Sequence, residues 1–148
     1  MKKRSKAPRR LGRADLKSTR VTAVQSREAN KDAQRIALLV AEAGLDKKAS
    51  EVEIIDVTGK VDYADYLVLM TGNSDRHVSS IAESVDSTLS KRGFRSISVE
   101  GLPRGEWVLI DFVDVVVHVF QERLRALYDL DGLWMDARRL SVPEASSS

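Results

Sequence analysis

The stretch 106–120 constrains the fold most, because it joins two apolar runs through a short turn. We predict β-strands over residues 106–112 and 114–120, with a two-residue turn at Phe112-Val113. Side chains alternate between the two faces of a strand, so one face of this hairpin is entirely aliphatic and must belong to the core. That face carries Val108, Ile110, Val115, Val117 and Val119.

The opposite face of the hairpin is mixed, and it carries Trp107, Leu109, Asp111, Asp114, Val116 and His118. In the predicted register Asp111 faces Asp114, and two carboxylates in that arrangement destabilise a sheet slightly. A Trp beside a His among aliphatic residues is typical of a protein–protein contact. The same pattern is expected if a helix covers this face and Trp107 is part of the core. The residues alone leave both interpretations open.

The remaining periodicity predicts helices and strands in the order α-β-β-α-β-β-β-α. The expected elements are a helix from Glu28 to a stop at Gly44, strands at 52–57 and 66–70, a helix capped by Asn73 or Ser74 and ended by Gly93, a strand at 97–99, the hairpin, and a short amphipathic segment at 128–140. This order predicts an α/β fold, a single compact domain over residues 28–140 with a mixed β-sheet flanked by helices. Residues 141–148 are expected to form a flexible C-terminal tail.

The formal net charge of +2 conceals a strong asymmetry. Residues 1–27 hold ten basic side chains and one acidic side chain, whereas residues 28–148 hold 14 basic and 21 acidic ones. The first segment has no sustained apolar period, so we predict a disordered basic N-terminal arm. Such an arm favours RNA through phosphate neutralisation, although a solvated leader or a misassigned start codon explains it equally simply. The expected RNA contacts are Lys2, Lys3, Arg4, Lys6, Arg9, Arg10 and Arg13.

Composition excludes several classes of function. The chain has no Cys, which rules out a disulfide scaffold, a thiolate zinc site and a Cys nucleophile. His77 and His118 are the only His residues and neither belongs to a spaced ligand motif, so we expect no metal and no cofactor. No apolar h-region follows the first basic residues, as a signal peptide would require, and the early Lys cluster fits a transit peptide poorly. We therefore expect a cytoplasmic protein.

Several ordered motifs together resemble the ribosomal silencing factor (Iojap-like) family. They lie at residues 65–77, 100–101, 105–111, 114–120 and 128–137, so the resemblance covers roughly residues 28–138. It implies a nucleotidyltransferase-like fold without that activity, and a translation factor that forms dimers. Such a factor binds a protein of the large ribosomal subunit at the intersubunit face, blocks association with the small subunit and represses translation when nutrients are short.

The resemblance also implies where the partner docks. It points to the face from Trp107 to His118, with Val116 on it and Tyr128 and Leu130 near it. Trp107 and Leu109 are expected to be apolar anchors, while Asp111 and Asp114 pair with Lys or Arg of a basic ribosomal protein. The family usually has Gly where this chain has Val113, so either the turn is wider here or Val113 is strained.

Two other functions compete with this interpretation. Thr71 to Ser74 follow a strand and precede a helix, where a nucleotidyltransferase would hold phosphates. No carboxylate pair follows on a neighbouring strand to hold a divalent metal, so a helix cap is the simpler explanation of these residues. We therefore expect that the protein is not an enzyme. The remaining alternative is an RNA-binding module for ribosome assembly that acts through the basic arm.

Overall fold

A computed structural model of the chain describes the backbone of residues 23–143 and the side chains of residues 30–143. The predicted RNA contacts at the start of the basic arm therefore lie outside the described residues, as does most of the predicted C-terminal tail. Within the described part no helix is both long and apolar enough to cross a membrane.

A six-stranded mixed sheet forms the centre of the fold, with strand order β3-β4-β5-β2-β1-β6. The strands are β1 (Ser50–Asp56), β2 (Tyr66–Gly72), β3 (Ser98–Glu100), β4 (Trp107–Asp111), β5 (Val115–Gln121) and β6 (Arg138–Leu140). Only β2 and β5 run parallel to each other, and every other neighbouring pair is antiparallel. All seven residues of β2 are buried, as expected of an interior strand covered on both faces. The predicted α/β class with a mixed sheet is confirmed.

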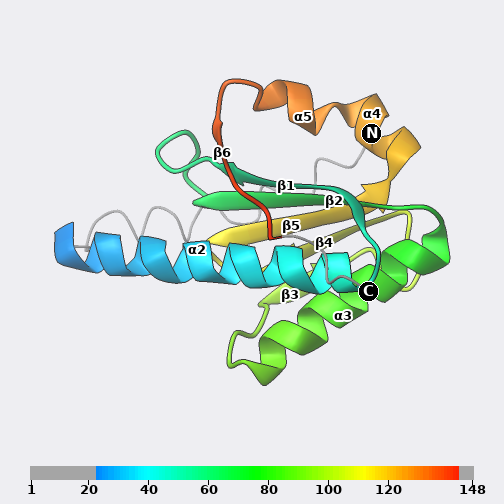
Figure 1. Cartoon of the computed structure of the whole chain (residues 1–148), viewed down its shortest axis with the longest axis horizontal. Coiled ribbons are helices and arrows are strands. Elements are labelled where there is room, and N and C mark those ends of the chain that lie inside the picture. Colours follow the sequence, from blue (N-terminus) through cyan, green and yellow to red (C-terminus); the bar gives the residue numbers. More distant parts are fainter. Residues whose placement is uncertain (1–22, 144–148) are drawn as a thin grey trace.

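Two long helices cover one face of the sheet, α2 (Ala23–Asp46) and α3 (Asp75–Lys91) (Figure 1). Helix α2 begins at Ala23 rather than at the predicted Glu28, so the last residues assigned to the arm are helical. Gly44 was expected to be the stop, but the left-handed residue that ends the helix is Lys48, with φ 67°. The Ala49 N–H returns to the Gly44 carbonyl at 3.0 Å, which completes a Schellman motif around Lys48.

Helix α3 starts and ends as the sequence predicts. The Ser74 hydroxyl accepts a hydrogen bond from the His77 N–H at 3.0 Å and is therefore the N-cap. At the other end Gly93 adopts φ 93°, and the Phe94 N–H reaches the Leu89 carbonyl at 2.8 Å. The capping pattern alone was sufficient to locate this helix.

The face covered by α2 and α3 holds the larger apolar core. The aliphatic side of the hairpin belongs to it as predicted, with Val108, Ile110, Val115, Val117 and Val119 all fully buried. They pack against the stripe of α3 formed by Val78, Ile81, Val85 and Leu89. Burial on this scale makes the core the main source of stability.

The C-terminal segment covers the other face, and its structure departs from prediction. It comprises the short helices α4 (Glu122–Tyr128) and α5 (Leu130–Leu133), followed by β6 (Figure 1). The sequence predicted one amphipathic segment from Tyr128 and neither α4 nor β6. Strand β6 pairs antiparallel with β1 at the edge of the sheet. The segment closes a second core around Leu69, Leu109, Val116 and Phe120, with Trp107, Leu124, Leu130 and Trp134 packed against it.

Candidate functional site

The mixed face of the β4–β5 hairpin has a different register from the predicted one. Leu109 pairs with His118, Trp107 with Phe120, and Asp111 with Val116. The predicted pairs of Asp111 with Asp114 and of Trp107 with His118 are therefore wrong. The shift is two residues, which leaves every side chain on its predicted face because alternation has period two.

The shift arises because the turn lies one residue further along the chain than predicted, with Val113 and Asp114 between the facing residues Phe112 and Val115. The Phe112 N–H donates to the Val115 carbonyl at 2.8 Å. The buried Asp111 carboxylate accepts a hydrogen bond from the Val113 N–H at 2.8 Å. Val113 has φ 81°, a conformation that a β-branched residue resists. Of the two consequences expected of Val at this position, the structure therefore shows the strained residue, in a turn that is displaced rather than widened.

Four rings gather at the junction of the hairpin and α4. The Trp107 ring centroid lies 4.9 Å from that of Tyr128, 5.2 Å from that of Phe120 and 5.8 Å from that of His118. The Trp107 indole N–H donates to His118 Nδ1 at 3.0 Å. Because an indole nitrogen can only donate, this bond requires an unprotonated Nδ1 on His118. We call Trp107, His118, Phe120 and Tyr128 the aromatic cluster.

The predicted partner-binding residues divide by exposure. Leu109, Asp111 and Val116 are each less than 5% exposed, so the chain itself covers them. Trp107, Asp114, His118 and Leu130 are half-buried, and Tyr128 is exposed. The interpretation of a covered core holds for Leu109, Asp111 and Val116, whereas the residues around the aromatic cluster stay accessible and the protein–protein contact remains a prediction.

Large apolar side chains on the C-terminal segment extend this accessible surface. Leu127, Leu133 and Met135 are between 64% and 76% exposed, and they flank Tyr128 and Leu130 in the chain. None of the three was predicted to bind the partner, and Leu127 lies on α4, a helix that was not predicted. We call these three residues together with Trp107, His118, Tyr128 and Leu130 the aromatic surface. Exposed apolar side chains close in the chain to an aromatic cluster are typical of protein docking sites.

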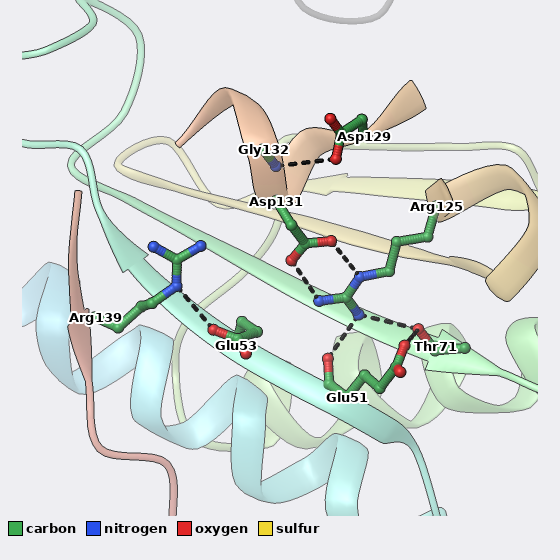
Figure 2. A network of polar contacts seen from close by, with 8 residues as sticks. All are labelled: Glu51, Glu53, Thr71, Arg125, Asp129, Asp131, Gly132 and Arg139. Atoms are coloured by element: carbon green, nitrogen blue, oxygen red, sulfur yellow. Dashed lines mark hydrogen bonds and ion pairs between the residues drawn. The ribbon is translucent and has the colours of Figure 1, made fainter. Parts of the chain in front are cut away.

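A buried guanidinium attaches the C-terminal segment to the sheet (Figure 2). Arg125 on α4 donates from Nε and Nη2 to the two carboxylate oxygens of Asp131, both at 2.9 Å. Its Nη1 donates to the Glu51 carbonyl at 2.6 Å and to the Thr71 hydroxyl at 2.9 Å. The hydrogen bonds from Arg125 hold the pKa of Asp131 below its ordinary value. This network was not predicted, because Glu51 and Thr71 lie far from Arg125 in the chain.

Two further ion pairs hold the end of the segment. Arg139 on β6 donates to Glu53 at 2.9 Å, and Arg138 donates to Asp56 at 3.3 Å. Burial alone would raise the pKa of Asp56, but hydrogen bonds from Thr58 and Arg138 outweigh it and lower that pKa. Polar contacts thus fasten α5 and β6 to the first strand of the sheet.

The loop before α3 is occupied by the chain's own contacts. His77 Nδ1 accepts a hydrogen bond from the Asn73 N–H at 2.9 Å, and Nε2 donates to the Lys47 carbonyl at 2.8 Å. A side chain at Gly72 would lie 2.8 Å from a methyl group of Val78, so the glycine is required by packing. Among residues 30–143 no group of three or more His, Asp or Glu side chains is placed to hold a metal ion. The residues of this loop are therefore explained by the capping and packing of α3.

Comparison with known proteins gives matches over the whole folded part. The family model described as "Ribosomal silencing factor during starvation" matches residues 30–148. The ribosomal silencing factor of Bacillus subtilis is 38% identical over 105 residues, which cover 70% of this chain and 89% of that protein. The chloroplastic Iojap protein of Zea mays is 26% identical over 118 residues, 78% of this chain and 51% of that protein. A crystal structure from Chromobacterium violaceum superposes with a TM-score of 0.68 at 33% identity, covering 77% of this chain and 95% of that one.

Proposed function

The chain belongs to the ribosomal silencing factor family, and from this membership we propose that it binds a protein of the large ribosomal subunit at the intersubunit face. Bound there, it occupies the space that the small subunit needs, blocks association of the subunits and represses translation when nutrients are short. The observation that carries the proposal is the family match across residues 30–148.

The aromatic surface supports docking on a protein. Trp107 and Tyr128 are in ring contact and stay accessible, and exposed aliphatic residues extend the surface along α4 and α5. Aromatic groups fixed by packing lose little conformational entropy on binding, which favours them as anchors. We propose that Trp107, His118, Tyr128 and Leu130 touch the partner, while Leu109, Asp111 and Val116 support them from beneath.

Charge favours a basic partner. Residues 28–148 hold 21 acidic and 14 basic side chains, so this part of the protein repels phosphate and attracts a basic ribosomal protein. Asp114 lies half-buried in the β4–β5 turn beside the mixed face, within reach of a Lys or Arg on that partner. Complementary charge of this kind raises the association rate and the specificity more than the affinity.

We further propose that the basic arm contacts ribosomal RNA next to the docking site, and that the free protein is a cytoplasmic homodimer. Nine of the ten basic residues of the arm lie before position 22, outside the described part of the chain. Its contribution is electrostatic, so deletion of residues 1–22 should flatten the salt dependence of ribosome binding without abolishing it. Sedimentation equilibrium of the free protein tests the dimer.

Co-sedimentation with purified large subunits tests the docking surface. Tyr128→Ala removes an exposed ring that the core does not need, and we expect it to weaken binding about tenfold or more while the melting temperature changes little. Gln34→Ala on α2 is the matched control, because it truncates a polar side chain on the opposite layer. Equal binding by Tyr128→Ala, Gln34→Ala and the wild type would refute the assignment of this surface.

A further inference from the structure

Arg125 is one of three polar or charged residues that are buried among those whose side chains are described. Its guanidinium makes four hydrogen bonds, and these reach α5, β1 and β2 from its own position on α4. Figure 2 shows the head group enclosed between Asp131 on one side and Glu51 with Thr71 on the other. A buried charge is tolerated only when it is paired and hydrogen-bonded this completely.

Two residues near the guanidinium, Glu51 and Asp129, have a left-handed backbone conformation. Glu51 has φ 49° within a bulge of β1, and its carbonyl accepts a hydrogen bond from Arg125. Asp129 also has φ 49°, ends α4, and accepts a hydrogen bond from the Gly132 N–H at 3.1 Å. That reversal of the chain brings Asp131 back to Arg125. Left-handed conformations of residues other than glycine cost free energy, and they cluster where a function requires the geometry.

The helix that Arg125 fixes carries accessible residues of the aromatic surface. Leu127 and Tyr128 lie two and three residues after it on α4, and the Tyr128 ring centroid is 4.9 Å from that of Trp107. Helix α4 has seven residues, too few to be stable without outside contacts. The place of the Tyr128 ring on the hairpin therefore depends on how α4 is attached to β1 and β2.

We propose that Arg125 is the positioning residue of the docking surface, because it holds α4 and α5 at the one placement on the sheet in which Tyr128 and Leu130 meet the partner beside Trp107. This inference rests on the proposed function, since it concerns the same surface. Arg125 itself is buried and does not touch the partner. Its contribution is to order the segment before binding, which removes an entropic cost from the association step.

The geometry requires arginine rather than any cation. The planar guanidinium matches the two oxygens of Asp131 and has a further nitrogen for Glu51 and Thr71. It also lies over the Phe120 ring, 5.8 Å from the centroid, so it contacts the aromatic cluster from beneath. A lysine ammonium group at position 125 keeps the positive charge but cannot make the paired hydrogen bonds of the planar guanidinium. Arg125→Lys therefore separates the geometric role from the charge.

The test compares Arg125→Lys, Arg125→Met and Asp131→Asn with the wild type and with Arg123→Met. Arg123 is exposed on the same helix, so its substitution removes the same charge without touching the network. Three quantities are measured on the full chain: the melting temperature, amide hydrogen exchange over residues 122–136 against that over α3, and the Kd for purified large subunits. Binding is measured at a temperature at which every variant is fully folded.

We expect Arg125→Lys and Arg125→Met to raise exchange over residues 122–136, to leave α3 protected, and to weaken binding about tenfold or more. Asp131→Asn should have the same effects to a smaller extent, and it also provides the test if Arg125→Met does not fold. Arg123→Met should bind within about twofold of the wild type, as a surface change of equal charge does.

Folded Arg125 variants that bind as tightly as the wild type would overturn this inference and leave the proposed function intact. The same holds if exchange over residues 122–136 does not change in the folded variants. A wild-type protein that fails to bind large subunits would instead overturn the proposed function, and this inference with it.

Discussion

The two faces of the sheet are covered in different ways. On one face α2 and α3 pack through aliphatic side chains, and each helix has more than four turns. On the other face α4 and α5 have seven and four residues, and ion pairs of Arg125, Arg138 and Arg139 attach the C-terminal segment to the sheet. The first covering is held by apolar burial, whereas the second combines a smaller apolar core with ion pairs and hydrogen bonds of defined geometry.

This difference has a physical basis. Apolar burial is large in free energy but nondirectional, so it tolerates small shifts of a helix. Hydrogen bonds to a buried guanidinium add less stability, yet they fix position and orientation because their geometry is narrow. Apolar burial is found on both faces, but the buried guanidinium and its hydrogen bonds are found only on the face that the C-terminal segment covers, among the residues whose side chains are described.

The largest effect should come from the aliphatic face. Leu89 is fully buried on α3, and Leu89→Ala should lower the free energy of unfolding by about 3 kcal/mol through lost burial and a cavity. Urea denaturation measures this loss. The folded fraction should still bind large subunits with the wild-type Kd. A weakened Kd at full folding would mean that the two faces are not separate in function.

A medium effect is expected at the turn that the two faces share. Val113→Gly relieves the strain of φ 81° and should raise the free energy of unfolding by about 1 kcal/mol. Val113→Ala is the matched control, because it removes the β-branch but keeps the unfavourable Cβ, and it should gain less than Val113→Gly. If neither variant is more stable than the wild type in urea, the turn is not strained.

The smallest effect is expected in acid and concerns the polar face. The folded pKa of Asp131 is lowered, so its contribution to stability is complete above the ordinary value of 3.8 and is lost as pH falls through the folded pKa. Asp131→Asn should therefore flatten the acid limb of the stability curve, and it should leave α3 protected from exchange. Asp136→Asn, at an exposed neighbouring position, is the control. Identical acid limbs for the two variants would contradict the role of Asp131.

Most of the fold could be predicted because local signals agreed with it. The Ser74 cap, the apolar β2 run and the aliphatic alternation of the hairpin each depend on neighbouring residues, and each is confirmed. The hairpin register was wrong because it depended on where the turn lies, and the turn is one residue further along the chain, where the Asp111 carboxylate accepts a hydrogen bond from the Val113 N–H. The face assignment survived because the error was two residues.

The candidate site was only partly predictable. Trp107, His118 and Tyr128 are conspicuous in the sequence, and they meet in the structure. Leu109 and Val116 are hidden because the C-terminal segment closes a second core over that face, and α4 and β6 of that segment were not predicted. Arg125 could not be found, since its partners Glu51 and Thr71 come from strands more than fifty residues earlier in the chain. Long-range polar pairing has no signature in a single sequence.

The most direct test of the central claim is re-association of purified subunits in the presence of the protein. Large subunits are preincubated with the wild type, Tyr128→Ala or Gln34→Ala, small subunits are added, and joined ribosomes are measured on a sucrose gradient. We predict that the wild type and Gln34→Ala reduce joining strongly, and that Tyr128→Ala leaves it close to the level without added protein. A wild-type protein that co-sediments with large subunits and leaves joining unchanged would contradict the account.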